Sequence, residues 1–141
     1  MNAKQRILFL CTHNAARSQM AEALLRHHAG DRFEACSAGL DPTAVHPLTH
    51  SVLAEIGVES SGLRAKPIKE FLGKQRADYA IMVCEADEQT CPRVYPFALQ
   101  MLQWPFEDPA KPAAAEVQLA AFRLVRDQIA ARIRAWVKQT A

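Results

Sequence analysis

Several features that would place a chain in a broad class at once are missing from this sequence. No apolar run approaches the roughly 20 residues that a membrane-spanning helix needs, and there are no internal repeats or low-complexity linkers. The net charge of +2 is too small to indicate a nucleic-acid partner. With four cysteines in 141 residues and no signal peptide, the chain is expected in the reducing cytoplasm rather than among secreted, disulfide-built proteins. The expected ligand is small.

What the sequence does contain is an alternation of strand-like and helix-like segments. Half of the residues are hydrophobic, enough to bury about two-thirds of the unfolded surface without a metal or disulfide staple. Periodicity predicts strands over 5–10, 33–37 and 78–83, a further apolar stretch over 98–104, and helices over 17–29, 44–57, 67–74 and 114–138. The alternation predicts an α/β fold in one domain, residues 1–141, with a parallel sheet and helices on both faces.

The last predicted helix has its apolar residues broadly on one face and its arginines largely outside that face. The apolar set is Val117, Ala121, Leu124, Val125, Ile129, Ile133 and Trp136, and the basic set is Arg123, Arg126, Arg132 and Arg134. The basic set is interpreted as a solvated surface rather than a partner site.

A cysteine at the end of the first predicted strand opens the most informative motif, Cys11-Thr12-His13-Asn14-Ala15-Ala16-Arg17-Ser18. The loop lies at the N-terminus of a predicted helix, where unpaired N–H groups and the helix dipole favour a bound anion. Arg17 can grip two anion oxygens, and the same positive field favours the thiolate form of Cys11. Ser18 can donate a hydrogen bond to that sulfur. The motif predicts an oxyanion site with a nucleophile inside it.

The alternative is that Cys11 is a small buried apolar residue, which is the commoner fate of a free cysteine. The spacing Cys-x5-Arg-Ser between a strand and a helix favours the functional interpretation. His13 is assigned to loop shape or solvent contact, because no partner histidine lies near it in the sequence.

These residues resemble the low-molecular-weight protein tyrosine phosphatase superfamily, and the run from Cys11 to Glu22 is most similar to its thioredoxin-coupled arsenate reductase branch. The stretch Ser37-Ala38-Gly39 matches a second family signature, and Asp108-Pro109 matches the site of the family's general acid. The resemblance runs through most of the chain. It implies a flavodoxin-like fold with a four-stranded parallel sheet.

A second pair of cysteines separates the two branches. Cys84 and Cys91 follow a predicted strand, whereas a phosphatase needs only one cysteine. A reductase must supply two electrons, which come from thiols in a chain without a cofactor motif. The alternatives are two structural thiols or half of a metal site, although a spacing of seven residues is too wide for a usual zinc pair. Cys36, the fourth cysteine, is assigned to the core.

The resemblance implies a disulfide between Cys84 and Cys91 that acts as a conformational switch. A regular helix would hold their Cα atoms about 10 Å apart, beyond the roughly 7 Å limit for a disulfide. Bonding therefore requires the segment to unwind. We expect an ordered reduced form and a looped oxidised form.

Asp108 has two interpretations. Asp-Pro is a common turn, and Glu107 stands beside it. The resemblance instead makes Asp108 the acid that protonates the departing oxygen. Tyrosine phosphatases usually continue with an aromatic residue, whereas residues 110–112 here are Ala-Lys-Pro. This departure weakens the phosphatase interpretation without excluding it.

The resemblance implies that arsenate, or a phosphate-like oxyanion, binds to loop residues 12–18 and is attacked by Cys11. Cys84 and Cys91 would then carry the electrons, and thioredoxin would restore the thiols. No organic cofactor is implied, and no metal apart from a potassium ion near the loop.

Some members of the reductase branch bind a potassium ion beside the loop. Asn14, Glu22 and Ser37 are similar to residues that organise the loop there. The potassium-binding members have an acidic residue near position 66, where this chain has Lys66. Lys66 is either a tethered replacement for the cation or a solvated surface lysine.

Two rival functions stay open beside arsenate reduction. A phosphatase would hydrolyse aryl phosphates through a phosphocysteine at Cys11 and would not need Cys84 or Cys91. An oxyanion or redox sensor would bind without turnover. The nucleophile, the acid and the resolving thiols together exceed what binding alone requires.

Overall fold

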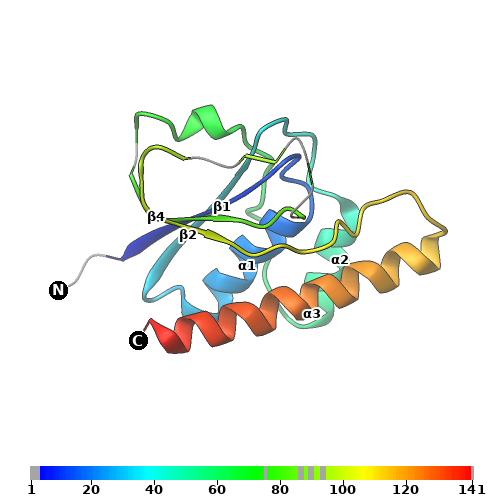
Figure 1. Cartoon of the computed structure of the whole chain (residues 1–141). Helices are drawn as coiled ribbons and strands as arrows, with labels where there is room; N and C mark the ends of the chain where they lie inside the picture. Colours follow the sequence, from blue (N-terminus) through cyan, green and yellow to red (C-terminus); the bar gives the residue numbers. More distant parts are fainter. Residues whose placement is uncertain (1–3, 75, 86–87, 89–90, 93–94, 141) are drawn as a thin grey trace.

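The computed structural model describes residues 4–74, 76–85, 88, 91–92 and 95–140. At its centre is a four-stranded sheet in the order β2-β1-β3-β4 (Figure 1). The strands are β1 (Gln5–Cys11), β2 (Phe33–Gly39), β3 (Ala77–Met82) and β4 (Ala98–Gln103). Every neighbouring pair is parallel, which confirms the predicted parallel sheet.

The α-helices lie on one side of the sheet, with α1 and α3 packed together and α2 against both (Figure 1). Their bounds, α1 (Arg17–Ala29), α2 (Pro47–Glu55) and α3 (Ala115–Gln139), are close to the predicted ranges. The other side carries the 3-10 turn η1 (Ile68–Glu70), where the sequence predicts a helix over 67–74. That prediction is wrong in type and length, because Pro67 and Gly73 leave too little chain for two α-helical turns.

The middle strand β1 is buried on both faces. Residues 7–10 are at most 1% exposed, as a continuous apolar run predicts for a central parallel strand. On the helical side, the ring of Trp136 in α3 packs against Phe33, Tyr79 and Trp104, with ring centroids 5.1–5.9 Å apart. This aromatic cluster fixes α3 across the sheet.

The buried stripe of α3 differs in part from the predicted one. It consists of Phe122, Val125, Arg126, Ile129, Ala130, Ile133 and Trp136. Val117 and Leu124 belong to the predicted apolar face, but they are 60% and 57% exposed and lie outside the buried stripe. The beginning of α3 projects beyond the sheet (Figure 1). Among the described residues, no helix is both long and apolar enough to cross a membrane.

The topology brings Cys11 and Cys84 to the same edge of the sheet. Cys11 ends β1, Leu10 is in register with Met82 of β3, and Cys84 lies two residues beyond β3. The strand order reverses between β1 and β3, and ligands of open α/β sheets bind outside the carboxyl ends of the strands at such a point. The candidate site is therefore expected there.

Candidate active site

The loop between β1 and α1, residues 12–16, is held from outside by the segment that follows β2. Backbone N–H groups of that segment donate to its carbonyl oxygens at 2.8–3.1 Å, pairing Leu40 with Cys11, Asp41 with Thr12, Thr43 with His13 and His46 with Ala15. In a planar trans peptide, the C=O and the next N–H point in opposite directions. The loop's N–H groups are thereby turned toward the thiol, as the 3.1 Å bond from Asn14 N–H to Cys11 Sγ illustrates.

This close packing explains the glycine in the second predicted signature. A Cβ on Gly39 would lie 2.7 Å from the carbonyl oxygen of Thr12 and 2.9 Å from the backbone nitrogen of Asn14. Both are backbone atoms, so neither can rotate away. Only a residue without a side chain lets β2 approach the anion loop this closely.

Cys11 is 3% exposed, and its thiol lies 2.8 Å from the hydroxyl of Ser18. That hydroxyl accepts a hydrogen bond from the side-chain amide of Asn14 at 2.7 Å. Because its lone pair faces Asn14, its own proton is available to the sulfur. The predicted contact between Ser18 and Cys11 is therefore present. The His13 ring nitrogen instead contacts the carbonyl oxygen of Asp41 at 3.0 Å.

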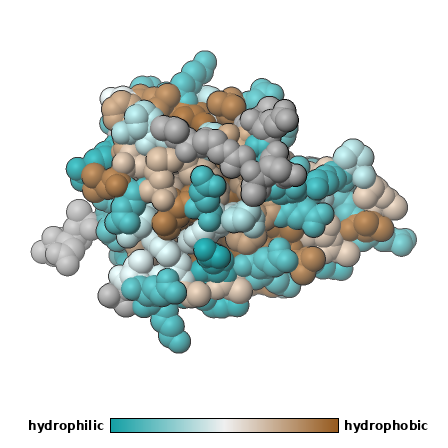
Figure 2. Space-filling model, viewed as in Figure 1, coloured by the Kyte–Doolittle hydropathy of each residue, from teal (hydrophilic) through white to brown (hydrophobic). Residues whose placement is uncertain are grey.

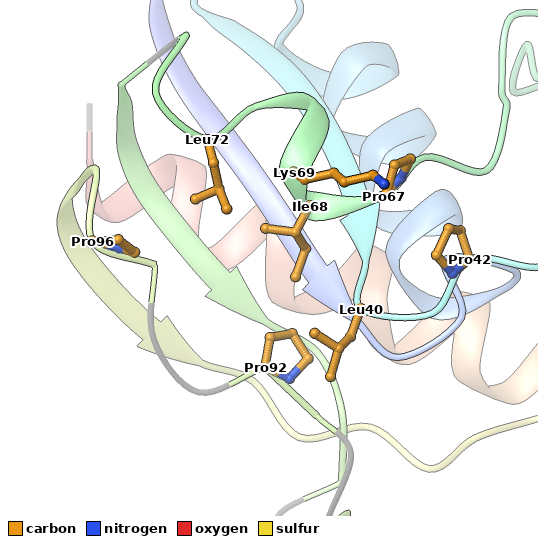
Figure 3. A pocket seen from close by; sticks show the side chains of 8 residues that line it. All are labelled: Leu40, Pro42, Pro67, Ile68, Lys69, Leu72, Pro92 and Pro96. Atoms are coloured by element: carbon orange, nitrogen blue, oxygen red, sulfur yellow. The ribbon is translucent and has the colours of Figure 1, made fainter.

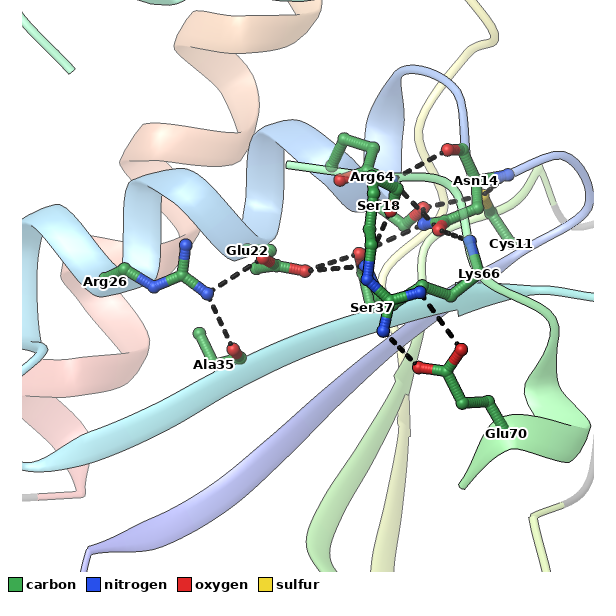
Figure 4. Close-up of polar contacts among 11 residues, drawn as sticks. Cys11, Asn14, Ser18, Glu22, Arg26, Ala35, Ser37, Arg64, Lys66 and Glu70 are labelled. Carbon is green, nitrogen blue, oxygen red and sulfur yellow. Dashed lines mark hydrogen bonds and ion pairs between the residues drawn. The ribbon is translucent and has the colours of Figure 1, made fainter. Parts of the chain in front are cut away.

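A buried polar network lies behind the loop (Figure 4). Asn14 adopts a positive φ of 52° and donates to Ser37 at 3.0 Å, and Ser37 donates to Glu22 at 2.7 Å. The side-chain oxygen of Asn14 accepts from the backbone N–H of Lys66 at 2.9 Å. The structure thus brings together all of the predicted loop-organising residues. It adds Gln19, which the sequence analysis missed and which also bonds to Asn14.

Lys66 points into this network (Figure 4). Its ammonium nitrogen lies 3.5 Å from Glu22 Oε1 and donates to the carbonyl oxygen of Arg64 at 2.7 Å. Lys66 and Glu22 are 6% and 4% exposed. The other carboxylate oxygen of Glu22 pairs with Arg26 at 2.8 Å. Lys66 is therefore not the solvated surface lysine of the alternative interpretation.

Arg17, at the start of α1, forms a salt bridge with Glu88, which lies between Cys84 and Cys91 in the sequence. Its guanidinium donates to both oxygens of Glu88, at 2.9 and 3.2 Å, and to the carbonyl oxygen of Phe106 at 3.1 Å. Burial alone would lower the pKa of Arg17, but the hydrogen bond to Glu88 and the negative charges of Asp108 and Cys11 outweigh it and raise the pKa. The sequence carries no signal for this long-range contact.

Asp108 forms the turn that one of its sequence interpretations predicts, and its side chain lies near Arg17. Its Oδ1 accepts from the N–H of Ala110 at 2.9 Å, as in a turn, and its Oδ2 lies 4.0 Å from the guanidinium of Arg17. Its own N–H donates to Glu85 at 3.0 Å, and Glu85 also pairs with Lys111 at 2.9 Å. Nothing in the sequence pattern marks Glu85, which ties the Asp108 turn to the segment after β3.

Cys84 and Cys91 form a disulfide, with Cα atoms 6.0 Å apart. The predicted pairing is present. The predicted unwinding of the segment between the two cysteines falls largely on residues 86–87 and 89–90, which lie outside the described residues. Cys84 Sγ lies 3.9 Å from the carbonyl oxygen of Leu10, the residue before Cys11. Cys36 is half-buried in β2, and burial raises the pKa of its thiol.

An apolar groove of about 810 Å³ lies beside the disulfide, on the side of the sheet that carries η1 (Figure 3). Its lining residues are Leu40, Pro42, Pro67, Ile68, Lys69, Leu72, Pro92 and Pro96. Pro92 directly follows Cys91, and Leu40 is 56% exposed. Figure 2 shows apolar side chains gathered on the η1 side of the molecule. In the part of the chain that the structure describes, no cluster of His, Cys, Asp and Glu is arranged to hold a metal ion.

An anion loop that encloses a thiol at the β1/β3 edge defines a class of proteins that act on tetrahedral oxyanions through cysteine. Within that class, the chain belongs to the low molecular weight phosphotyrosine protein phosphatase family, whose sequence profile matches residues 6–141.

The chain is also similar to individual members of the reductase branch. A protein named arsenate reductase from Halalkalibacterium halodurans is 36% identical over 136 residues, 96% of each chain. A solved arsenate reductase in the oxidised state aligns with a TM-score of 0.79 at 26% identity, over 97% of this chain and 99% of that one. The Corynebacterium glutamicum thioredoxin-dependent arsenate reductase aligns with a TM-score of 0.71 at 31% identity, over 98% of this chain and 62% of that one.

Proposed function

We propose that this chain reduces arsenate to arsenite, with Cys11 as the nucleophile and Cys84 and Cys91 as the resolving thiols. The observation that carries the proposal is the Cys84–Cys91 disulfide at the sheet edge where Cys11 lies. Hydrolysis of a phosphate ester transfers no electrons and makes no use of such a pair. The similarity to proteins named arsenate reductase over nearly the whole chain supports the same function.

In the first step, the Cys11 thiolate attacks arsenic while the loop N–H groups and Arg17 hold the anion oxygens. A sulfur–arsenic bond forms, and one arsenic–oxygen bond breaks. Asp108 gives a proton to the departing oxygen, which leaves as water. The turn at Ala110 and the contact with Glu85, which restrain the backbone of Asp108, support this role.

In the second step, Cys84 attacks the sulfur of Cys11. The new sulfur–sulfur bond replaces the sulfur–arsenic bond, whose electron pair stays on arsenic, so arsenic leaves as arsenite. Cys91 then attacks Cys84, which forms the Cys84–Cys91 disulfide and frees the Cys11 thiolate.

A dithiol protein of the thioredoxin type would reduce this disulfide and return the enzyme to its starting state. We propose that it approaches over the apolar groove, because Pro92 in the groove wall follows Cys91 directly. Such a cycle requires a compartment that keeps thioredoxin reduced, such as the cytoplasm.

We further propose that the ammonium group of Lys66 replaces the potassium ion that some relatives bind beside the loop. The support is the buried contact between Lys66 and Glu22, on the same carboxylate oxygen that accepts from Ser37. A tethered cation would neutralise Glu22 and steady Asn14 without a diffusible ion.

The test is NADPH consumption by the purified protein with thioredoxin, thioredoxin reductase and arsenate. We expect the wild type to consume NADPH when arsenate is present. Neither Cys84→Ser nor Cys91→Ser should sustain this consumption over repeated catalytic cycles. Cys91→Ser should stop after one turnover, at the first disulfide. Cys36→Ser is the matched control, because Cys36 lies in β2 with a raised thiol pKa and should leave turnover unchanged.

The same preparations should be assayed for hydrolysis of an aryl phosphate. If hydrolysis is robust and indifferent to Cys84 and Cys91, while arsenate drives no NADPH consumption, the chain is a phosphatase and the proposal is wrong.

A further inference from the structure

Glu88 occupies the guanidinium of Arg17, the arginine of the predicted oxyanion loop. Both of its oxygens accept from Arg17, Oε2 accepts from the hydroxyl of Thr12 at 2.7 Å, and Oε1 accepts from the backbone N–H of Glu85 at 3.1 Å. Arg17 and Thr12 both belong to the predicted oxyanion loop. A carboxylate that spans the two arginine nitrogens uses the donors that a tetrahedral oxyanion would require.

The carboxylate is held firmly in its ionised form. Burial would raise the pKa of Glu88, but the hydrogen bonds from Arg17 and Thr12 outweigh it and lower the pKa to about 2. Charge-assisted, two-point pairing of arginine with a carboxylate is among the stronger polar contacts in proteins. An incoming oxyanion must displace Glu88 from Arg17 before it can use the same guanidinium.

The position of Glu88 is tied to the disulfide. Glu88 lies within the ring that the Cys84–Cys91 bond closes, and the two Cα atoms are 6.0 Å apart. Without the bond the segment is free to lengthen, since a regular helix between the cysteines would place them about 10 Å apart. Reduction therefore removes the constraint that holds Glu88 between two Cα atoms 6.0 Å apart.

We propose that Glu88 is an internal competitor for the oxyanion site, seated on Arg17 in the disulfide form and withdrawn when Cys84 and Cys91 are reduced. Oxyanion affinity is thereby coupled to the redox state of the second cysteine pair. The inference rests on the proposed function only in that the loop binds an oxyanion and the cysteine pair cycles. Its consequence is that a spent enzyme does not fill its site with phosphate, which shares the shape and charge of arsenate.

The test is the affinity for inorganic phosphate, measured by isothermal titration calorimetry on oxidised protein and on protein reduced with a phosphine. We expect the oxidised wild type to bind phosphate at least about tenfold more weakly than the reduced wild type, given the usual strength of charge-assisted hydrogen bonds. In Glu88→Ala, the oxidised protein should bind about as tightly as the reduced protein. Glu107→Ala is the control, because it removes one negative charge from an exposed side chain beside Asp108.

Equal affinities in the oxidised and reduced wild type would overturn the proposal without any variant. So would an oxidised Glu88→Ala that folds, as judged by circular dichroism, yet binds phosphate as weakly as the oxidised wild type. Because phosphate is not reduced, the result does not depend on arsenate turnover. A protein without reductase activity could still show the redox-dependent affinity, and an active reductase could lack it.

Discussion

Glu22 has three positive or polar partners in the buried network behind the anion loop. Ser37 and Lys66 share its Oε1, while Arg26 takes its Oε2. A buried carboxylate needs such partners because burial of an unpaired charge is unfavourable. The ammonium group of Lys66 therefore supplies part of the positive charge that the buried Glu22 requires.

At this scale we expect the wild type to reduce arsenate equally fast in potassium and sodium buffers of equal ionic strength. Lys66→Met should slow the reaction, because it leaves Glu22 with less compensation, and potassium should restore more of the rate than sodium does. Steady-state NADPH consumption in the two buffers measures both effects. Lys74→Met, which removes an exposed lysine, is the control and should behave like the wild type. Clear stimulation of the wild type by potassium would end the idea of a tethered cation.

At the scale of elements, the anion loop depends on how closely β2 approaches it. Gly39 pairs with Cys11 in the sheet register, and its backbone N–H donates to the carbonyl oxygen of Lys66 at 2.8 Å. The same glycine therefore joins β1, β2 and the segment that carries Lys66. Any side chain there must push one of these apart.

We expect Gly39→Ala to lower the free energy of unfolding by about 1–3 kcal/mol, the usual range for overpacking. It should also weaken phosphate binding, because the atoms that its Cβ would meet belong to the anion loop. Chemical unfolding and phosphate titration of the reduced protein measure the two effects. Gly62→Ala is the matched control, since its Cβ would meet no atom within 4 Å. An unchanged phosphate affinity in Gly39→Ala would contradict this account of the loop.

Where α2 meets α3, a buried arginine of α3 binds the end of α2. The spacing of apolar residues in α3 does not predict this contact. Arg126 is 8% exposed, and its guanidinium donates to the carbonyl oxygen of Val52 and to Glu55 at the end of α2. The last carbonyl groups of a helix have no partner within it, and a cation near them is favourable. The assignment of Arg126 to a solvated surface is therefore wrong.

At the scale of the whole molecule, several carboxylates stabilise the fold only when they are ionised. The pKa of Glu88 falls from its ordinary value of 4.5 to about 2 because hydrogen bonds from Arg17 and Thr12 outweigh burial. Hydrogen bonds also lower the pKa values of Glu55, Glu59, Glu70 and Glu85. A group whose pKa is lowered by folding stabilises the protein at pH values above its pKa in the unfolded chain. That stabilisation is lost as the pH falls through its pKa in the folded protein.

We therefore expect the free energy of unfolding of the oxidised protein to fall as pH decreases from about 4.5 to about 2, because the unfolded chain takes up protons first. Glu88→Gln should be less stable than the wild type at neutral pH and should lose less over this window, so that the two curves converge in acid. Denaturant titrations at several pH values measure the difference. Parallel curves would contradict the assigned state of Glu88.

The sequence by itself determined the order of the strands and α-helices along the chain and the place of the anion loop between the first two of them. The strand, the loop and α1 occupy the continuous stretch 5–29, where apolar periodicity and the Cys-x5-Arg-Ser spacing act locally. Alternating strands and helices then leave few topologies besides a parallel sheet. Cys84 and Cys91 were also recognisable from the sequence, because two nearby thiols can exchange electrons whatever fold they belong to.

Only the tertiary structure decided which distant side chains meet that loop. Glu88 reaches Arg17 across 71 residues of sequence, and Lys66 reaches Glu22 across 44. Each contact joins segments that follow different strands of the sheet. Whether such charges meet depends on strand order and packing, whereas local periodicity reports only which face of an element is apolar.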